Sequence, residues 1–310
     1  MKILILGGHG FVGRNMAKEL KRTKNQVNQL SRRDGLDLRD YNTTKKYFRK
    51  IMPDVIINVA ADVGSLNYVT ERAAQVVDNN MRMLLNLYKA ANDIVPRGII
   101  INPVANCAFP GGEELYSESN FLNGPTHQSV FAYGNTRRMM VVLSEVYKMQ
   151  CGFRSINFFV PNMYGPYDST DPNKAHALNA LTCKVVEAKH KGANEIKVWG
   201  SGVVIREWLF APDCAKVFMK TIERKEEIGW DEPINIGQNF GLSVRELVNI
   251  IVKEADFNGK ILWDRSMPDG APKKVMDDRK FLKQFPNFKF TNLRDGIRET
   301  IKYYESIYPY

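Results

Sequence analysis

Short apolar runs alternate with longer amphipathic stretches along the first half of the chain. The apolar runs predict strands, and the stretches in which apolar residues recur every three or four positions predict helices. The expected strands cover residues 2–6, 26–30, 54–59, 98–102 and 154–159. The expected helices cover residues 11–21, 41–51, 71–92 and 133–149. This alternation predicts an α/β protein of the Rossmann type, a doubly wound parallel sheet with helices on both faces.

The alternation stops near residue 165. Beyond it, the expected elements are more irregular: helices over 175–191, 243–255 and 292–306, and strands over 196–199 and 260–263. Ser243 and Glu246 have the spacing of a capping box. We therefore predict a dinucleotide-binding domain over residues 1–165. A smaller α+β substrate-binding lobe is expected over residues 166–310, with segments that return to the sheet.

A glycine-rich turn joins the first expected strand to the first helix. Gly7, Gly10 and Gly13 have the spacing of a dinucleotide-binding turn. In such a turn the first glycine permits the tight bend, the second lets a pyrophosphate approach the backbone, and the third lets the helix pack on the sheet. The N–H groups at the start of the helix, at Phe11 and Val12, bind phosphate in this arrangement.

The end of the second strand bears on the choice between NADP and NAD. An arginine there favours the 2′-phosphate of NADP, whereas a carboxylate favours the ribose 2′-hydroxyl of NAD. Arg32 and Arg33 therefore favour NADP(H), and Asp34 and Asp37 leave NAD(H) as the alternative. The further expected cofactor contacts are the adenine-reading pair Asp37-Leu38 and the small residues Ala60 and Ala61.

Composition and charge narrow the class of ligand. The 310 residues include 44 Lys+Arg and 34 Asp+Glu, a formal net charge of +10. The basic clusters are short and have no interleaved aromatic residues, so a phosphate-rich small ligand is expected and nucleic acid is not. The four cysteines form no CxxC pair, so we expect no metal site and no disulfide framework. No apolar run reaches 18 residues, so we expect a cytoplasmic protein without a membrane partner.

Tyr133 and Arg137 lie one turn apart on an expected helix, so their side chains share a face. This pair resembles the Tyr-x-x-x-Lys pattern of extended short-chain dehydrogenases/reductases. Further motifs occur in order: Ala60-Ala61-Asp62-Val63-Gly64, Asn106-Cys107-Ala108-Phe109-Pro110, Asn162-Met163-Tyr164-Gly165-Pro166, Val198-Trp199-Gly200-Ser201-Gly202, Arg206-Glu207-Trp208-Leu209 and Pro268-Asp269-Gly270-Ala271-Pro272-Lys273-Lys274. Together they closely resemble the GDP-L-fucose synthase family, GDP-4-keto-6-deoxy-mannose 3,5-epimerase/4-reductases, over essentially the whole chain.

The resemblance implies roles for the matching residues. Tyr133 would donate a proton to the C4 oxygen while NADPH delivers hydride to C4. Cys107 and His176 match the acid/base pair that exchanges protons at C3 and C5, where the ketone acidifies the hydrogens and a thiol and an imidazole can titrate near neutral pH. Implied cofactor contacts are Asn80, Tyr133, Arg137, Val160, Asn162 and Met163. Implied substrate contacts are Asn162, His176, Lys184, Trp199, Arg206 and Lys274, with Arg206 suited to the diphosphate because its guanidinium binds phosphate bidentately.

Two catalytic positions of the family are changed. The Ser that precedes the Cys by two residues is Ala105, and the Lys is Arg137. Arginine keeps the positive charge but is planar, larger and unable to release a proton. Ala105 cannot donate a hydrogen bond to the C4 oxygen, a loss that costs about 10²–10³ in rate at an oxyanion site. Asn106 replaces this donor if its side chain points inward.

Three hypotheses follow. The first is an NADP(H)-dependent reductase or epimerase/reductase of a GDP-linked 4-keto (6-deoxy) sugar, in nucleotide-sugar biosynthesis for surface polysaccharide. The second is a nucleotide-sugar epimerase or C4 dehydrogenase of the same fold. The third is a cofactor-binding partner subunit with weak catalysis. The resemblance also implies a homodimer that pairs through helices 71–92 and 133–149, of which the first has a broad apolar stripe.

Overall fold

The computed structural model describes residues 1–226, 232–267 and 269–310, so Pro268 of the last motif lies outside the described residues. Its centre is a six-stranded sheet with the order β10-β5-β4-β3-β1-β2, in which every pair is parallel. These strands are β1 (Lys2–Leu6), β2 (Gln26–Leu30), β3 (Val55–Asn58), β4 (Ile99–Ala105), β5 (Arg154–Val160) and β10 (Ile234–Asn235). The chain leaves β1 towards β2 and returns to β3 on the other side of β1. Ligands bind at such a reversal, beyond the carboxyl ends of the strands.

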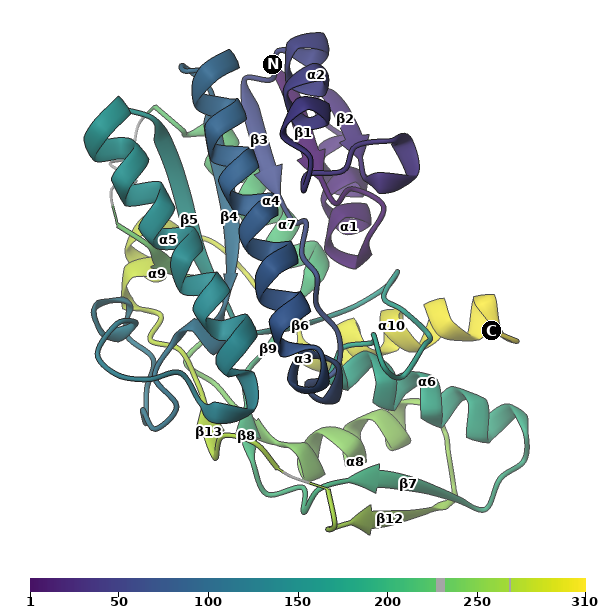
Figure 1. The fold of residues 1–310 in the computed structure, drawn as a ribbon. Coiled ribbons are helices and arrows are strands. Elements are labelled where there is room, and N and C mark those ends of the chain that lie inside the picture. Colours follow the sequence, from purple (N-terminus) through teal and green to yellow (C-terminus); the bar gives the residue numbers. More distant parts are fainter. Residues whose placement is uncertain (227–231, 268) are drawn as a thin grey trace.

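Helices cover both faces of this sheet (Figure 1). One face packs against α1 (Phe11–Leu20) and α7 (Ala211–Glu223), and the other packs against α2 (Tyr41–Ile51), α4 (Ala73–Ile94) and α5 (Phe131–Cys151). Successive strand side chains point to opposite faces, so Ile3 and Ile5 join the first core while Leu4 and Leu6 join the second. The expected doubly wound α/β architecture is confirmed.

The remaining elements form the smaller part of the molecule. Three helices, α6 (Ala177–His190), α8 (Val244–Glu254) and α10 (Leu293–Ile307), share one apolar core. The capping box of α8 is confirmed, because the Ser243 side chain accepts from the Glu246 N–H and the Glu246 carboxylate accepts from the Ser243 N–H. The further elements are α3 (Leu66–Glu71), β6 (Asn162–Tyr164), β7 (Glu195–Trp199), β8 (Ile205–Arg206), β9 (Trp208–Phe210), β11 (Leu242–Ser243), β12 (Lys260–Asp264), β13 (Lys273–Lys274) and α9 (Arg279–Gln284).

Segments from the second half of the chain also build the large sheet. Helix α7 packs on α1, β10 pairs with β5, and Phe281 of α9 lies in the same core as Ile3. The sequence did not indicate α3 or α7, and β4 extends three residues beyond its expected end to Ala105. The division at residue 165 stays a prediction.

A ladder of buried amide side chains crosses the three central strands. Asn58 of β3 donates from Nδ2 to Oδ1 of Asn102 of β4 (3.1 Å), and Asn102 donates from Nδ2 to Oδ1 of Asn157 of β5 (2.9 Å) and to the Tyr88 hydroxyl of α4 (2.9 Å). Ser144 of α5 contacts the Tyr88 oxygen at 2.5 Å and donates to Oδ1 of Asn157 at 3.1 Å. The ladder therefore ties β3, β4 and β5 to the two helices that cover them.

No helix among residues 1–226, 232–267 and 269–310 is long and apolar enough to cross a membrane. Within the same ranges, no group of three or more His, Cys, Asp or Glu side chains is placed to hold a metal ion.

Candidate active site

A cleft runs along the carboxyl ends of the strands and contains three chambers. The first has a volume of about 690 Å³ and lies beside the glycine-rich turn, the second has about 490 Å³, and the third has about 320 Å³ and lies in the smaller part of the molecule. Gly10, Ala60 and Ala61 line both the first and the second chamber. Asn162 and Arg206 line both the second and the third. The chambers therefore form one continuous site.

The glycine-rich turn is built by close backbone contacts. Gly7 has φ +74°, and a Cβ atom there would lie 2.8 Å from Cα of Ala60. A Cβ atom on Gly13 would lie 2.4 Å from the carbonyl oxygen of Gly7, so α1 can begin this close to β1 only with glycine at that position. Gly10 is the N-cap of α1, and no side chain caps the helix. The first N–H groups of α1 therefore have no side-chain acceptor, as a phosphate-binding turn requires.

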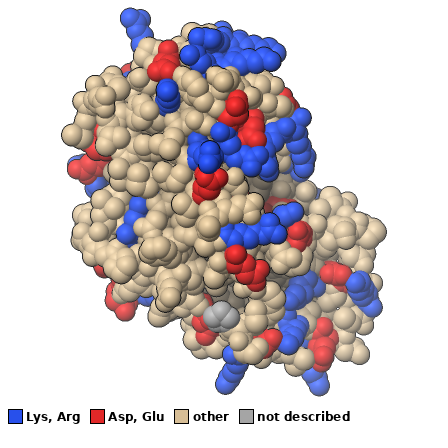
Figure 2. Space-filling view, viewed as in Figure 1, with Lys and Arg blue, Asp and Glu red and all other residues tan. Residues whose placement is uncertain are grey.

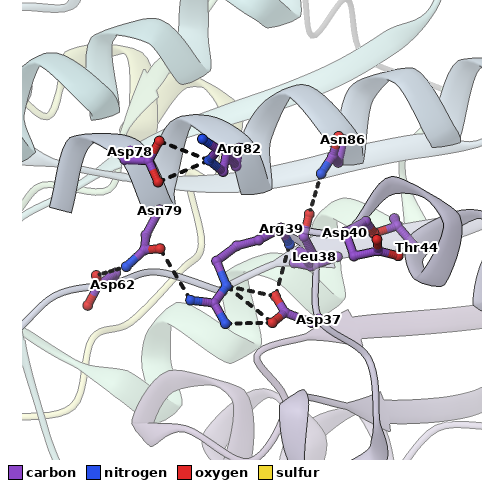
Figure 3. A network of polar contacts seen from close by, with 10 residues as sticks. All are labelled: Asp37, Leu38, Arg39, Asp40, Thr44, Asp62, Asp78, Asn79, Arg82 and Asn86. Atoms are coloured by element: carbon purple, nitrogen blue, oxygen red, sulfur yellow. Dashed lines mark hydrogen bonds and ion pairs between the residues drawn. The ribbon is translucent and has the colours of Figure 1, made fainter. Parts of the chain in front are cut away.

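The two carboxylates that left NAD as an alternative both have side-chain partners: Arg39 for Asp37 and His9 for Asp34. Arg39 binds Asp37 through Nε at 3.0 Å and Nη2 at 2.6 Å, and this hydrogen bonding lowers the pKa of the Asp37 carboxyl. Figure 3 shows that Arg39 continues to Asn79 of α4, which in turn donates to Asp62 (2.7 Å). Asp34 lies 3.0 Å from Nε2 of His9.

Arg32 and Arg33 line the same chamber. No carboxylate among the described residues lies within ion-pair distance of either guanidinium. A chamber with two arginines outside ion-pair distance of any described carboxylate, and with Asp37 bound by Arg39, fits a 2′-phosphate better than a bare ribose hydroxyl.

Tyr133 and Arg137 face each other on the wall of the second chamber. The Arg137 guanidinium lies 4.8 Å from the centre of the Tyr133 ring, is 3% exposed, and donates from Nη2 to Oδ1 of Asn80 at 2.8 Å. Burial raises the pKa of the Tyr133 phenol, and the charge on Arg137 lowers it only in part. Tyr133 is therefore protonated at neutral pH, as a proton donor must be.

Ala105, Asn106 and Cys107 lie at the end of β4, opposite Tyr133. A Cβ atom on Gly134 would lie 2.4 Å from the carbonyl oxygen of Cys107, so the glycine lets α5 bring Tyr133 close to this segment. Asn106 is 4% exposed and lines the chamber, and its Nδ2 has no hydrogen-bond partner among the described residues. A buried amide donor of this kind requires an acceptor that the protein does not supply.

Cys107 is buried in the same wall. Burial raises the pKa of its thiol, while the charges on Lys274 and Arg137 oppose this change in part. Lys274 is also buried, and burial lowers the pKa of its ammonium group. The chamber thus holds a thiol next to cationic groups that stabilise the thiolate.

His176 lines the same chamber and is the N-cap of α6. Its Nδ1 lies 3.1 Å from Oδ2 of Asp168, a carboxylate that is 7% exposed. The Phe11 ring lies 5.2 Å from the imidazole, centre to centre. The imidazole is therefore held between α1 and the loop that precedes α6.

The third chamber has a cationic and aromatic wall. Arg206 donates from Nη1 to the Ile205 carbonyl (2.8 Å) and from Nη2 to the Asp269 carbonyl (3.2 Å). Lys184 donates to the carbonyl of Lys197 at 2.7 Å, and Trp199 is half exposed. Neither cation is bound to a carboxylate within the described ranges, so both remain available to an anionic ligand.

The structure brings most of the expected site residues to the cleft. Gly7, Arg32, Arg33, Asp37 and Leu38 line the first chamber, and Lys184 and Trp199 line the third. The second chamber is lined by Phe11, Val12, Asn106, Cys107, Tyr133, Arg137, Val160, Asn162, Met163, His176, Arg206 and Lys274.

Two expected cofactor contacts lie behind the cleft wall. Gly13 packs against the turn, and Asn80 is fully buried, where it binds Arg137 and accepts from the Asp62 backbone N–H (3.1 Å). Sequence reasoning missed the contributions of Arg39, Ser129, Asp168 and Asp269. Asp168 lies within two residues of the Asn162–Pro166 motif, which was the available signal.

The chain resembles known proteins over nearly its whole length. The model of the NAD dependent epimerase/dehydratase family matches residues 3–237. A GDP-L-fucose synthase of Azorhizobium caulinodans is 29% identical over 98% of this chain and 96% of its own length, and one of Dictyostelium discoideum is 28% identical over 97% and 94%. The crystal structure of a GDP-L-fucose synthetase from Naegleria fowleri bound to NADP superposes with a TM-score of 0.87 at 27% identity, covering 99% of this chain and 94% of that one.

The family match includes the glycine-rich turn, the six-stranded sheet and the facing Tyr133 and Arg137. The chain therefore belongs to the NAD-dependent epimerase/dehydratase family, enzymes of the extended short-chain dehydrogenase/reductase fold.

Proposed function

We propose that this protein is an NADP(H)-dependent epimerase/reductase that acts on a GDP-linked 4-keto-6-deoxy sugar in nucleotide-sugar biosynthesis for surface polysaccharide. The observation that carries the proposal is the second chamber. It gathers Tyr133, Cys107 and His176 between a dinucleotide-binding turn and a cationic third chamber. The similarity to GDP-L-fucose synthases over nearly the full length supports the GDP-sugar substrate.

NADP(H) is the cofactor we propose for the first chamber. The turn at Gly7 and Gly10 would hold the pyrophosphate, and Arg32 and Arg33 the 2′-phosphate, because Asp37 is already bound by Arg39. When bound, NADPH supplies hydride to C4 of the sugar.

Reduction also needs a proton for the C4 oxygen. Tyr133 donates it, and the charge on Arg137 stabilises the tyrosinate that remains. We propose that Asn106, whose buried Nδ2 has no partner among the described residues, takes the place of the serine hydroxyl that Ala105 lacks. The ketone oxygen between these two donors is polarised both for reduction and for removal of the neighbouring hydrogens.

Epimerisation uses two chamber groups from different elements, Cys107 after β4 and His176 at the start of α6. Burial raises the pKa of the Cys107 thiol, so the thiol must first lose its proton to solvent. The thiolate then takes the proton from the carbon next to the ketone, and the electron pair of that C–H bond forms the enolate. His176, in its imidazolium form, returns a proton from the other side, and the enolate electron pair forms the new C–H bond. Lys274 and Arg137 support the thiolate state of Cys107.

To test this proposal, the protein is mixed with NADPH and GDP-4-keto-6-deoxy-mannose, and the absorbance of NADPH is followed. We expect NADPH absorbance to fall with one NADPH consumed per sugar. Absence of a fall at high enzyme concentration would disprove reduction. In deuterated water, label at C3 or C5 reports epimerisation, and label without NADPH consumption would identify an enzyme that only epimerises.

The cysteine has its own test. We expect Cys107→Ser to lose deuterium incorporation and to keep reduction of a ketone that is already epimerised. The matched control is Cys183→Ser, because Cys183 is equally buried but lies in α6 outside the chamber lining. Equal loss of both activities in Cys107→Ser would show that the residue is structural.

The nucleotide would bind in the third chamber. Arg206 and Lys274 face the diphosphate, and Lys184 and Trp199 face the nucleoside. In the presence of NADP(H), GDP-linked sugars should raise the melting temperature more than their UDP-linked counterparts do, because only the preferred nucleotide adds its binding free energy to the folded state. A larger shift with UDP-sugars would contradict the assignment.

We also propose that residues 1–165 bind the cofactor, that residues 166–310 hold most of the substrate site, and that the protein works in the cytoplasm as a homodimer. Helices α4 and α5 lie side by side, and their outer faces expose Val77, Leu85, Val146 and Met149. Figure 2 shows broad areas without charged side chains on this side of the molecule, although α4 also exposes the ion pair of Asp78 and Arg82. Light scattering should give a dimer for the native chain and a monomer for Leu85→Lys.

The control for this interface is Leu282→Lys, because both leucines are 49% exposed and Leu282 belongs to α9, whose Phe281 packs in the core on the other face of the sheet from α4 and α5. A monomeric native chain, or a dimeric Leu85→Lys variant, would contradict the proposed interface.

A further inference from the structure

The loop between β6 and α6 carries a buried carboxylate that has no role in the chemistry derived above. Asp168 is 7% exposed, and one of its oxygens, Oδ2, makes three contacts. It accepts from the backbone N–H of His176 at 2.8 Å and from Nδ2 of Asn179 at 2.7 Å, and it lies 3.1 Å from Nδ1 of the His176 ring. Two donors of fixed position therefore hold the carboxylate against the imidazole.

This geometry sets the position of the proton on the imidazole. An ionised carboxylate can only accept hydrogen bonds, so Nδ1 of His176 must carry the hydrogen that it shares with Asp168. The other nitrogen, Nε2, lies across the ring from Asp168. The His176 side chain keeps 35% of its surface exposed, and His176 and Asp168 both line the second chamber. The imidazole therefore reaches the chamber with Asp168 bound to its Nδ1 side.

The charges of Asp168 and His176 each favour the ionised form of the other group. Burial lowers the pKa of His176, but the adjacent Asp168 carboxylate outweighs burial, so the pKa of the imidazole is raised. Burial raises the pKa of Asp168, and its interactions with His176 outweigh that and lower it.

The other groups near the pair add no competing charge. Burial raises the pKa of the Cys183 thiol of α6 and of the Tyr304 phenol of α10, so both are neutral. Lys174 lies 3.5 Å from Asp171 in the same loop, and α1 presents the apolar Phe11 ring. The negative charge that acts on His176 is therefore that of Asp168.

We propose that Asp168 is a positioning residue that holds the proton on Nδ1 of His176 and thereby presents Nε2–H as the proton donor to the sugar carbon beside the ketone. The transfer breaks the Nε2–H bond and forms a C–H bond with the electron pair of the enolate, and His176 becomes neutral. Solvent then restores its proton, while Cys107 releases the one that it removed. The sugar step rests on the function proposed above, whereas the state of the imidazole does not.

The first test needs no substrate. Asp168→Asn keeps the oxygen that accepts from the His176 N–H and removes the charge. Nitrogen-15 NMR of the histidine rings, with His176 assigned from a His176→Gln variant, should show Nδ1–H in the neutral form of the native chain. The His176 pKa should fall by about one unit or more in Asp168→Asn, because removal of an adjacent opposite charge has effects of that size. Asp171→Asn, the same substitution three positions away at a side chain 41% exposed, should leave it unchanged.

An unchanged His176 pKa in Asp168→Asn, or an unprotonated Nδ1 in the native chain, would overturn the proposal. The melting temperatures of both variants show whether the fold is intact.

The second test measures deuterium incorporation against pH. In Asp168→Asn the alkaline limit of incorporation should move to lower pH, with a loss of about tenfold per unit of pKa shift above that limit. Reduction of a ketone that is already epimerised should continue in the variant. An equal loss at every pH would indicate a purely structural role and overturn the proposal.

The outcomes for the two proposals are distinct. If the native chain incorporates no deuterium while NMR shows the shifted His176 pKa, the assigned sugar chemistry fails and the coupling of Asp168 to His176 stands.

Discussion

The buried amide ladder makes a quantitative prediction about stability. Asn102 lies at its centre and joins β3, β4 and β5. Replacing it with Val keeps a residue that favours a central strand but removes every side-chain hydrogen bond at that position.

The cost follows from what each partner keeps. Tyr88 and Asn157 both retain Ser144, at 2.5 and 3.1 Å, so each loses one hydrogen bond worth about 1 kcal/mol net. Asn58 Nδ2 has no other partner among the described residues and becomes a buried donor without an acceptor, at about 1–3 kcal/mol. We therefore expect Asn102→Val to lower the free energy of unfolding by about 3–5 kcal/mol, a large share of the 5–15 kcal/mol typical of a folded domain.

The assay is urea unfolding, followed by far-UV circular dichroism and tryptophan fluorescence, whose coincidence justifies a free energy. Asn28→Val is the matched control, because Asn28 lies in β2 and its buried Nδ2 has no partner among the described residues. This control should leave the free energy of unfolding unchanged or slightly higher.

The double variant Asn58→Val/Asn102→Val tests whether the unpaired Asn58 donor causes the loss of stability. It has no orphaned Asn58 donor, so it should be more stable than Asn102→Val alone by about 1–3 kcal/mol. If the double variant instead loses the sum of the two single effects, the orphaned donor does not explain the cost and the account is wrong.

Three further predictions concern charged groups. Burial raises the pKa of Glu207 from 4.5 to about 7, so the folded state binds the Glu207 proton more tightly than the unfolded state does. The free energy of unfolding should therefore fall by about 3 kcal/mol as the pH rises from 4 to 8. Urea titrations at several pH values should show this dependence in the native chain and not in Glu207→Gln. Arg137→Lys keeps the charge beside Tyr133 and should retain reduction within about tenfold, whereas Arg137→Met should lose about 100-fold in kcat, measured by NADPH consumption. Lys274→Met removes a charge that favours the Cys107 thiolate, so alkylation of Cys107, followed by mass spectrometry, should require higher pH than in the native chain.

Local patterns were sufficient for much of the fold. The apolar pattern predicted strand β2 and helix α2 to the residue, and the Ser243–Glu246 spacing predicted the start of α8. The turn from Gly7 to Gly13 was also readable, because its close contacts involve residues near in sequence or the end of the adjacent strand. Helix α7 was missed although it is amphipathic, since it follows the apolar β9 directly.

The choice between NADP and NAD needed both the residue types in the sequence and the side-chain contacts in the structure. Arg32 and Arg33 favoured NADP(H), whereas Asp34 and Asp37 left NAD(H) as the alternative. Only the structure shows that Arg39 binds Asp37, two positions away, and that His9 contacts Asp34, 25 positions away, because residue types alone do not give side-chain positions.

The sequence by itself therefore determined the strand–turn–helix order, the dinucleotide-binding turn and the residue types of the site, because these depend on neighbours a few positions apart. Tertiary structure alone decided which groups meet, such as Asn58 with Asn102 and Arg137 with Asn80. It also decided that Nδ2 of Asn106 is buried without a partner among the described residues. The physical reason is that hydrogen bonds and pKa shifts depend on distance and burial in space. Folding sets both by bringing together segments that are dozens of residues apart.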